Sequence, residues 1–321
     1  TAIEQKKDVA TRAASATCLS LLAEQVPNMI CSSADLSNSD KTDGFLKKTK
    51  DIVRNDFSGA FFQAGVSELT MACMCIGMML HGGVITAMGT FFVFSDYMKP
   101  AIRLAALMQI PVKFIWSHDA FRVGEDGPTH EPIEQLAAFR ATPNLNVIRP
   151  ADGNEVSAAW KVAVETKDRP SVLVFSRQNL PVLEHSQELA YEGVKRGAYV
   201  VSPQKCDTPE GILIATGSEV ALAIEAQKVL AEEGIDVSVV SMPSMNLFEE
   251  QPKEYRESVL PSDVRKRVAV EMGASFGWGQ YVGLDGATVT IDRFGLSGNG
   301  NKVMETLGFT VENVVNTFKS L

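Results

Sequence analysis

Hydrophobic residues along the chain follow two patterns, short continuous apolar runs and longer amphipathic stretches. The short runs predict strands at 29–32, 84–88, 112–116, 146–148 and 171–175. The amphipathic stretches predict helices at 6–24, 67–80, 94–108 and 152–165. Asp152 stands where its carboxylate can cap the last of these helices. Short buried strands that alternate with helices are typical of a parallel sheet covered on both faces.

This rhythm stops near residue 182 and then starts again. The polar segment 182–194, VLEHSQELAYEGV, predicts a linker. Beyond it the pattern predicts strands at 211–215, 237–241, 267–271 and 288–291, a helix at 218–233 with Ser218 as its cap, and a helical C-terminus. We therefore expect an α/β fold with two doubly wound domains and mainly parallel sheets, at 1–183 and 195–321, joined by a linker at 184–194.

One stretch without formal charge, residues 69–95, is long enough to raise the question of a membrane span. His81, Gly82 and Gly83 interrupt it in the middle. A helix-like run precedes these residues and a β-rich run follows them. We therefore expect a buried helix, a turn and a strand rather than a membrane span.

Composition narrows the classes of partner. The 321 residues carry a net charge of −9 and no basic run, which argues against nucleic acid as a partner but allows a small anionic ligand. The five cysteines show no paired spacing, and Cys73 and Cys75 lie in an apolar stretch, so we expect packed thiols. These thiols and the lack of a visible secretory signal predict a cytoplasmic protein.

The segment 117–135, SHDAFRVGEDGPTHEPIEQ, is dense in ionisable groups and follows directly on a predicted strand. It therefore lies at the edge of the sheet where ligands of such folds bind. Four alternatives remain open from composition alone: a metal site, a solvated turn, a catalytic or ligand-binding loop, and a buried structural histidine. The spacing matches neither an HExxH nor an EF-hand pattern. The possible metal ligands are His118, Asp119, Glu125, Asp126, His130 and Glu131.

The same segment carries a family resemblance. GEDGPTHEPIEQ, followed by RATPNLNVIRPAD, resembles the transketolase family, and SSADL, LHGG, VLVFSRQNLP, IATGSEV and GFTVENVV extend the resemblance over the whole chain. It covers the pyrimidine-binding and C-terminal domains, two of the three domains that transketolases generally have. The GDG…N signature that holds the diphosphate of thiamine diphosphate and its divalent metal is absent from these residues. The resemblance therefore implies that this chain binds only the pyrimidine end of the cofactor and ligates no metal itself.

The resemblance also implies roles for residues at the cofactor. Glu68 matches the catalytic glutamate that hydrogen-bonds the aminopyrimidine ring. The spacing of three between Phe91, Phe94 and Tyr97 predicts one face of a helix, where the default role is core packing. The resemblance instead assigns these rings to the wall of the pyrimidine pocket. Two further cofactor-binding residues, Asp35 and Leu36, belong to the SSADL segment.

A second set of residues matches positions that bind the sugar substrate. The residues expected at the sugar phosphate are Arg12, Ser39, His118 and Arg177. Asp126 is expected at the donor hydroxyls, and His130 at the reacting end, where it can assist proton transfer. Ser39 follows Asn38 where relatives often have proline, so its loop is expected to be set differently. The role of Arg122 stays open between the substrate's anion and solvent.

The implied reaction is the reversible transfer of a two-carbon ketol unit from a ketose phosphate to an aldose phosphate. The expected partners are a diphosphate-binding transketolase N-terminal subunit or domain, which would carry Mg²⁺ or Ca²⁺, and a further copy of this chain. Two other hypotheses stay open: a related thiamine enzyme for an unusual phosphorylated or sulfonated sugar, and a non-catalytic subunit. The second domain is expected to be scaffold and interface, and its SGNGN at 297–301 departs from the Ala/Pro-containing stretch of relatives.

Overall fold

A parallel six-stranded sheet forms the centre of the first half of the computed structural model, which describes residues 7–321. Its strands lie in the order β3-β2-β4-β5-β7-β6. Their bounds are β2 Met29–Ser33, β3 Phe61–Gln63, β4 Ile85–Phe91, β5 Lys113–Ser117, β6 Asn146–Ile148 and β7 Ser171–Phe175. The strands predicted from apolar runs are confirmed, and β3 is an additional edge strand.

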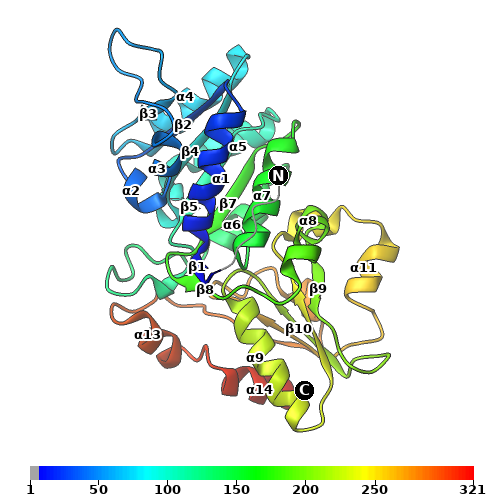
Figure 1. Ribbon diagram of the computed structural model, residues 1–321. Helices are drawn as coiled ribbons and strands as arrows, with labels where there is room; N and C mark the ends of the chain where they lie inside the picture. The colour runs from blue at the N-terminus through cyan, green and yellow to red at the C-terminus, as the bar shows by residue number, and fades with distance from the viewer. Residues whose placement is uncertain (1–6) are drawn as a thin grey trace.

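Helices cover both faces of this sheet (Figure 1). One face packs against α1 (Thr11–Gln25) and α7 (Gly153–Glu165), and the other against α4 (Glu68–His81) and α5 (Ser95–Leu107). Short helices α2 (Ser37–Asp40), α3 (Asp43–Leu46) and α6 (Gln135–Arg140) lie in the connections. The predicted cap of α7 is confirmed, because an Asp152 carboxylate oxygen accepts from the N–H groups of Asn154 and Glu155, each at 2.9 Å.

The second half is a five-stranded sheet of order β13-β12-β10-β11-β9, parallel except for β9. Its strands are β9 Tyr199–Ser202, β10 Gly211–Ala215, β11 Val237–Ser241, β12 Arg267–Val270 and β13 Ala287–Val289. One face packs against α9 (Glu219–Glu232), α13 (Gly300–Thr306) and α14 (Val311–Lys319). The other packs against α10 (Met245–Glu249), α11 (Lys253–Val259) and α12 (Gly279–Val282). Two doubly wound domains with mainly parallel sheets are thus confirmed.

The connection between the halves is folded rather than irregular. Helix α8 spans Ser186–Arg196, which covers most of the segment predicted to be a linker, and it packs on α7. Ala190 and Val194, one helical turn apart, are buried in the first core, Tyr191 packs against it, and Ser186 Oγ donates to Asp152. Before the helix, β8 (Asn179–Leu180) pairs antiparallel with β1 (Val9–Ala10).

Several local expectations differ from the structure. The first helix begins at Thr11, because β1 precedes it; residue 6, where it was predicted to begin, lies outside the described residues. Ser218 stands at the N-cap of α9, but its side chain forms no capping bond and donates to Glu219 instead. Cys75 is buried as expected, whereas Cys73 is exposed because it lies on the outer side of α4. Within residues 7–321, no helix has the length and apolar character needed to cross a membrane.

Two arginines of the first half enter the second sheet at its carboxyl edge. Arg149, which is fully buried, donates to Asp119 at 2.7 and 3.0 Å and also binds Glu219. Arg140 forms a bidentate pair with Glu271, with distances of 2.7 and 2.6 Å. Glu219 and Glu271 follow β10 and β12, at the edge where ligands of such sheets bind. The domain contact therefore occupies part of this edge with buried ion pairs.

Candidate active site

The residues that the sequence singles out gather at the carboxyl edge of the first sheet. Ser39 follows β2, Phe91 is the last residue of β4, and His118 and Arg177 follow β5 and β7. Glu68 opens α4 after β3. Parallel strands bring these segments, which are far apart in the chain, to one edge.

Four residues form a cationic cluster. Arg12 Nη1 donates to the Ser39 carbonyl oxygen at 2.7 Å and to Ser39 Oγ at 3.2 Å. Burial lowers the pKa of Arg12 below its usual value, the Arg177 guanidinium acts in the same direction, and Asp40 opposes both. Burial, Arg12 and Arg177 lower the pKa of His118 to about 3, so this imidazole is neutral at neutral pH. Two guanidiniums, a hydroxyl and a neutral imidazole suit a phosphate.

The backbone and side chain of His118 are both fixed. Its φ of 64° is left-handed, and its Nδ1 lies 2.9 Å from Ser117 Oγ. The next residue is Asp119, which is held by Arg149 in the domain contact. The imidazole lies 3.8 Å from the Phe91 ring, measured between centroids. The cationic cluster therefore adjoins the aromatic residues.

The three aromatic residues do not share a helix face. Phe91 ends β4, Phe94 ends a short 3₁₀ helix (Phe92–Phe94), and Tyr97 lies in α5, because the chain turns from strand to helix here. Their rings still follow one another, with centroids 5.8 Å apart for Phe91 and Phe94 and 6.2 Å apart for Phe94 and Tyr97. The His130 ring lies edge-on to Phe94 at 5.2 Å. The rings form a curved apolar wall beside two imidazoles.

Glu68 is hydrogen-bonded to β4, the strand that ends in Phe91. Glu68 is 7% exposed, and its Oε1 accepts a hydrogen bond from Thr90 Oγ1 at 3.3 Å. Thr90 directly precedes Phe91 in β4. A nearly buried carboxylate beside aromatic rings can hydrogen-bond a flat heterocycle. Asp35 and Leu36 lie at the left-handed turn after β2; among the described residues, no hydrogen bond joins them to Glu68.

The acidic loop has two different parts. His118 is buried, whereas Glu125 and Asp126 are exposed, so the segment combines a buried histidine with a solvated turn. His130 Nδ1 lies 2.8 Å from Thr129 Oγ1. In the part of the chain that the structure describes, no group of three or more His, Cys, Asp or Glu residues could hold a metal ion.

Sequence reasoning did not single out several residues next to this loop. Arg122, whose role was left open, lines a cavity of about 460 Å³ together with Asp126 and Arg177. Gln178 and residues 298–301 of the second half complete the wall. SGNGN, residues 297–301, departs from the family pattern, and this departure was the feature of the sequence that drew attention to the segment. Sequence alone did not indicate that the segment lies opposite Arg177.

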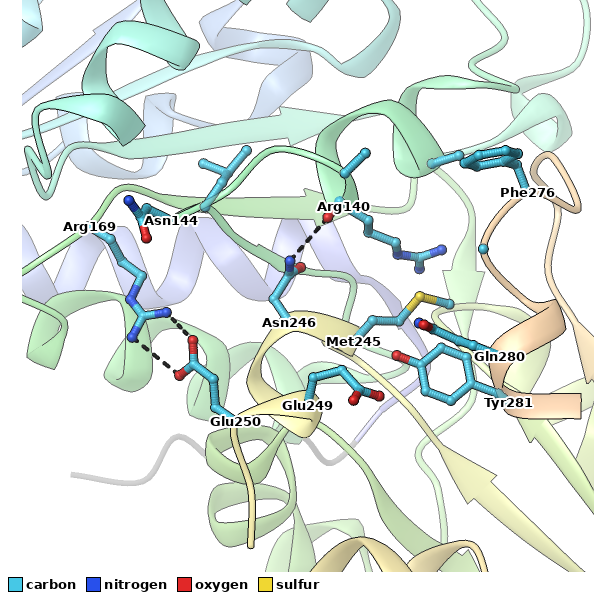
Figure 2. A pocket seen from close by; sticks show the side chains of 14 residues that line it. Arg140, Asn144, Arg169, Met245, Asn246, Glu249, Glu250, Phe276, Gln280 and Tyr281 are labelled. Carbon is cyan, nitrogen blue, oxygen red and sulfur yellow. Dashed lines mark hydrogen bonds and ion pairs between the residues drawn. The ribbon is translucent and has the colours of Figure 1, made fainter. Parts of the chain in front are cut away.

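A second cavity, of about 440 Å³, lies on the domain contact and is shown in Figure 2. Arg140, Asn144 and Arg169 line it from the first half, and Glu249, Glu250 and Tyr281 from the second. The dashed bonds in Figure 2 join Arg169 to Glu250 and Asn246 to the Arg140 carbonyl oxygen. Asn144 and Arg169 precede β6 and β7, so this cavity lies at the other edge of the first sheet from the candidate site.

The first half of the chain matches a known domain family. Residues 7–182 match the family model described as transketolase, pyrimidine binding domain. The chain belongs to the transketolase family. Residues 197–310 match the transketolase-like TK C-terminal domain.

The curated relatives that this chain matches are longer than the chain itself. The chain is 56% identical to the transketolase of Bacillus subtilis and 55% identical to that of Geobacillus stearothermophilus, over 318 residues that cover 99% of this chain and 47% of each relative. It therefore spans about half the length of the curated relatives it matches. The transketolase from Leishmania mexicana superposes with a TM-score of 0.94 at 40% identity, over 99% of this chain and 46% of that one.

A more distant structure matches the chain over its full length. A protein described as "Split gene transketolase, inactive beta4 tetramer" superposes with a TM-score of 0.77 at 24% identity. The match covers 97% of this chain and 98% of that one. This resemblance concerns the fold: the same two-domain transketolase architecture occurs there in a chain of similar extent.

Proposed function

We propose that this chain is the pyrimidine-binding and C-terminal half of a transketolase. The reaction is the reversible transfer of a two-carbon ketol unit from a ketose phosphate to an aldose phosphate. The observation that carries the proposal is the convergence of Arg12, Ser39, His118 and Arg177 beside Phe91. An anion site next to an apolar aromatic wall suits a sugar phosphate that meets a heterocyclic cofactor.

The residues at the wall fit the pyrimidine end of thiamine diphosphate. When bound, this cofactor supplies the electron sink that cleavage of the ketose carbon–carbon bond requires. Glu68 hydrogen-bonds a ring nitrogen and shares its proton, while Phe91, Phe94 and Tyr97 cover the ring. Asp35 and Leu36 approach the cofactor from the turn after β2. Within the described residues the Thr90 hydroxyl is the one hydrogen-bond donor to Glu68, which leaves its second carboxylate oxygen for the ring.

The substrate is held at two ends. Arg12, Ser39, His118 and Arg177 bind the phosphate, and the neutral state of His118 makes it a hydrogen-bonding group rather than a charge. Asp126 accepts hydrogen bonds from donor hydroxyls, which favours sugars that satisfy it. His130, edge-on to Phe94, assists proton transfer at the reacting carbons.

The diphosphate end of the cofactor needs a partner. Diphosphate binding requires a metal ion or a phosphate-binding loop, and residues 7–321 contain no metal-ligating cluster. We propose that a transketolase N-terminal subunit or domain supplies both, with Mg²⁺ or Ca²⁺ bound there. The length of the curated relatives, about twice that matched here, supports this division.

A further copy of this chain is the second proposed partner. Several leucines on the outer surfaces of α4 and α5 are exposed, and the two helices pack side by side. Their exposed fractions are 45% for Leu69, 58% for Leu80, 49% for Leu104 and 66% for Leu107. A group of exposed leucines on two adjacent helices is typical of a protein–protein interface.

The reaction is proposed to take place in the cytoplasm. All five cysteines are free thiols, and Cys73 and Cys206 are exposed. Exposed free thiols suit a reducing compartment.

Co-expression with a candidate diphosphate-binding chain tests the proposal. We expect a stable complex that transfers a ketol unit from a ketose phosphate to an aldose phosphate, with no transfer by either chain alone. A panel that includes sulfonated sugars separates transketolase from a related transferase. A complex that forms and binds thiamine diphosphate but transfers no ketol unit to any acceptor would overturn the assignment in favour of a non-catalytic subunit.

A further inference from the structure

The cavity at Arg177 extends between the two halves of the molecule. Its volume is about 460 Å³, and polar groups from both halves line it. In Figure 1, α13 of the second half lies beneath the loops of the first half, and it contacts the 3₁₀ turn at Phe121–Val123. The lining residues used below are Arg122, Asp126, Arg177, Gln178, Asn299 and Asn301.

Two hydrogen bonds and the close approach of Gly300 hold the second half against the acidic loop. Ser297 Oγ donates to the Glu125 carbonyl oxygen at 2.9 Å, and the Gly298 N–H donates to the Gly124 carbonyl oxygen at 3.3 Å. A Cβ on Gly300 would lie 2.6 Å from the Arg122 carbonyl oxygen, so only glycine allows this approach. Residues 297–301 therefore form a fixed wall of the cavity.

Arg122 is held in this wall without being neutralised. Its Nε and Nη2 both donate to Asn301 Oδ1, at 3.3 and 2.8 Å. Asn301 is uncharged, and within residues 7–321 neither Arg122 nor Arg177 forms an ion pair. Two guanidiniums that form no ion pair and line one cavity can bind an anionic ligand, although Glu125 and Asp126 of the same cavity offset their charge.

The remaining groups favour a ligand that also carries hydroxyls. Both amide atoms of the Gln178 side chain are buried without a hydrogen-bond partner in the described chain. Buried polar groups of this kind are normally satisfied, by a ligand or by water. The carboxylates of Glu125 and Asp126 also line the cavity; they would repel an anion but accept hydrogen bonds from hydroxyls. An anionic end together with hydroxyls describes a sugar phosphate.

We infer that Arg122, held by Asn301 of the second half, is a second arginine for the phosphate end of the sugar substrate, next to Arg177. The second half thereby takes part in substrate choice and is more than scaffold. The inference rests on the proposed function for the identity of the reaction. All the groups it uses belong to this chain, so binding can be measured without a partner.

Binding of ribose 5-phosphate to the chain, followed by NMR or calorimetric titration, is the first test, with ribose as the unphosphorylated probe. Arg122→Ala is expected to weaken binding of ribose 5-phosphate about tenfold, the order of one charge-assisted hydrogen bond, and to leave ribose unaffected. Arg122→Lys restores part of the loss, and Asn301→Ala gives a smaller one because the guanidinium is no longer held. Arg265→Ala, an exposed arginine paired with Asp285, is the matched control.

The inference is overturned if Arg177→Ala weakens binding of ribose 5-phosphate while Arg122→Ala binds it as the unaltered chain does. A second measurement uses the chain assembled with a diphosphate-binding partner. There Arg122→Ala is expected to raise the KM for the aldose phosphate about tenfold and to leave kcat within about twofold. If the unaltered assembly transfers no ketol unit, the proposed function fails, and the binding titration still decides the role of Arg122.

Discussion

Glu68 combines near-complete burial with a single hydrogen bond from Thr90, which suits a carboxylate that serves a ligand. Replacing Glu68 with alanine removes the group proposed to share a proton with the cofactor ring. We expect Glu68→Ala to lower kcat of the assembled enzyme at least about 100-fold. Glu68→Gln keeps a hydrogen-bonding side chain and should also be slow, since the amide cannot share that proton.

Steady-state ketol transfer at saturating cofactor measures this loss. Thermal unfolding of each variant chain is the control, because the role proposed for Glu68 lies in catalysis and not in the core. Full activity of Glu68→Ala with normal cofactor binding would contradict the assignment.

His118 makes stability depend on pH. Burial, Arg12 and Arg177 lower its pKa to about 3 in the folded chain, from an ordinary value of 6.5. Between about pH 3 and pH 6.5 the unfolded state therefore binds more protons than the folded state. The free energy of unfolding falls as the pH drops below about 6.5. The His118→Asn variant should lose less stability than the unaltered chain when the pH is lowered from 7.5 to 4. Urea unfolding at several pH values measures this difference.

His185→Asn is a closely matched control. His185 also has a left-handed backbone, with φ of 63° against 64° for His118, and asparagine tolerates this conformation. Its side chain is 59% exposed. We expect His185→Asn to keep the acid sensitivity of the unaltered chain; equal sensitivity in the His118 variant would exclude His118 as its source.

At the scale of elements, α4 and α5 present leucines to solvent that the core does not need. Leu104→Lys combined with Leu107→Lys should therefore leave the fold intact and weaken self-association at least about tenfold, since each buried leucine contributes about 1.5–3 kcal/mol. Sedimentation velocity over a range of concentrations measures the change. Leu284→Lys, at a side chain that is 99% exposed on the second half, is the control. An unchanged oligomer in the double variant would exclude this face as the interface.

The elements that the sequence predicted are those with a strong hydrophobic pattern. The strands β2, β5, β7 and β10 are continuous apolar runs, and burial on both faces produces that pattern. Helix α8 escaped prediction because few apolar side chains, chiefly Ala190, Tyr191 and Val194, pack on the core, which leaves a polar composition typical of a linker. The aromatic residues were assigned to a helix because a spacing of three does not reveal that the chain turns from β4 to α5 between them.

The candidate site was predictable only where a motif carried it. The resemblance named Arg12, His118 and Arg177, and the fold brings them together from the first turn of α1 and from the segments after β5 and β7. Arg122 and Asn301 are 179 residues apart, and no local pattern indicates that they meet. A contact that depends on how two domains dock cannot be deduced from the periodicity of either domain.

The docking of the two halves is itself a prediction at the scale of the whole molecule. Arg149 is the shared partner of Asp119 and Glu219, and all three are buried. Arg149→Ala leaves two carboxylates without their cation, which we expect to cost about 3–5 kcal/mol in the free energy of unfolding. Arg265→Ala, which breaks an exposed pair, should cost at most about 1 kcal/mol. Urea unfolding compares the two, and similar small losses would mean that the buried network does not stabilise the docked halves.

Because Asp119 adjoins His118, Arg149→Ala should also disturb the cationic cluster, although none of that cluster's own side chains is changed.

Binding of the cofactor to the chain alone is the last prediction. Glu68 and Phe91, proposed to hold the pyrimidine, are both nearly buried, whereas the described residues offer no metal cluster for the diphosphate. Calorimetry with thiamine diphosphate and Mg²⁺ should therefore detect weak or no binding to the chain alone, and clear binding once a diphosphate-binding chain is added. Micromolar binding by the 321-residue chain itself would show that it holds the diphosphate without a partner, and the proposed division of the site would then be wrong.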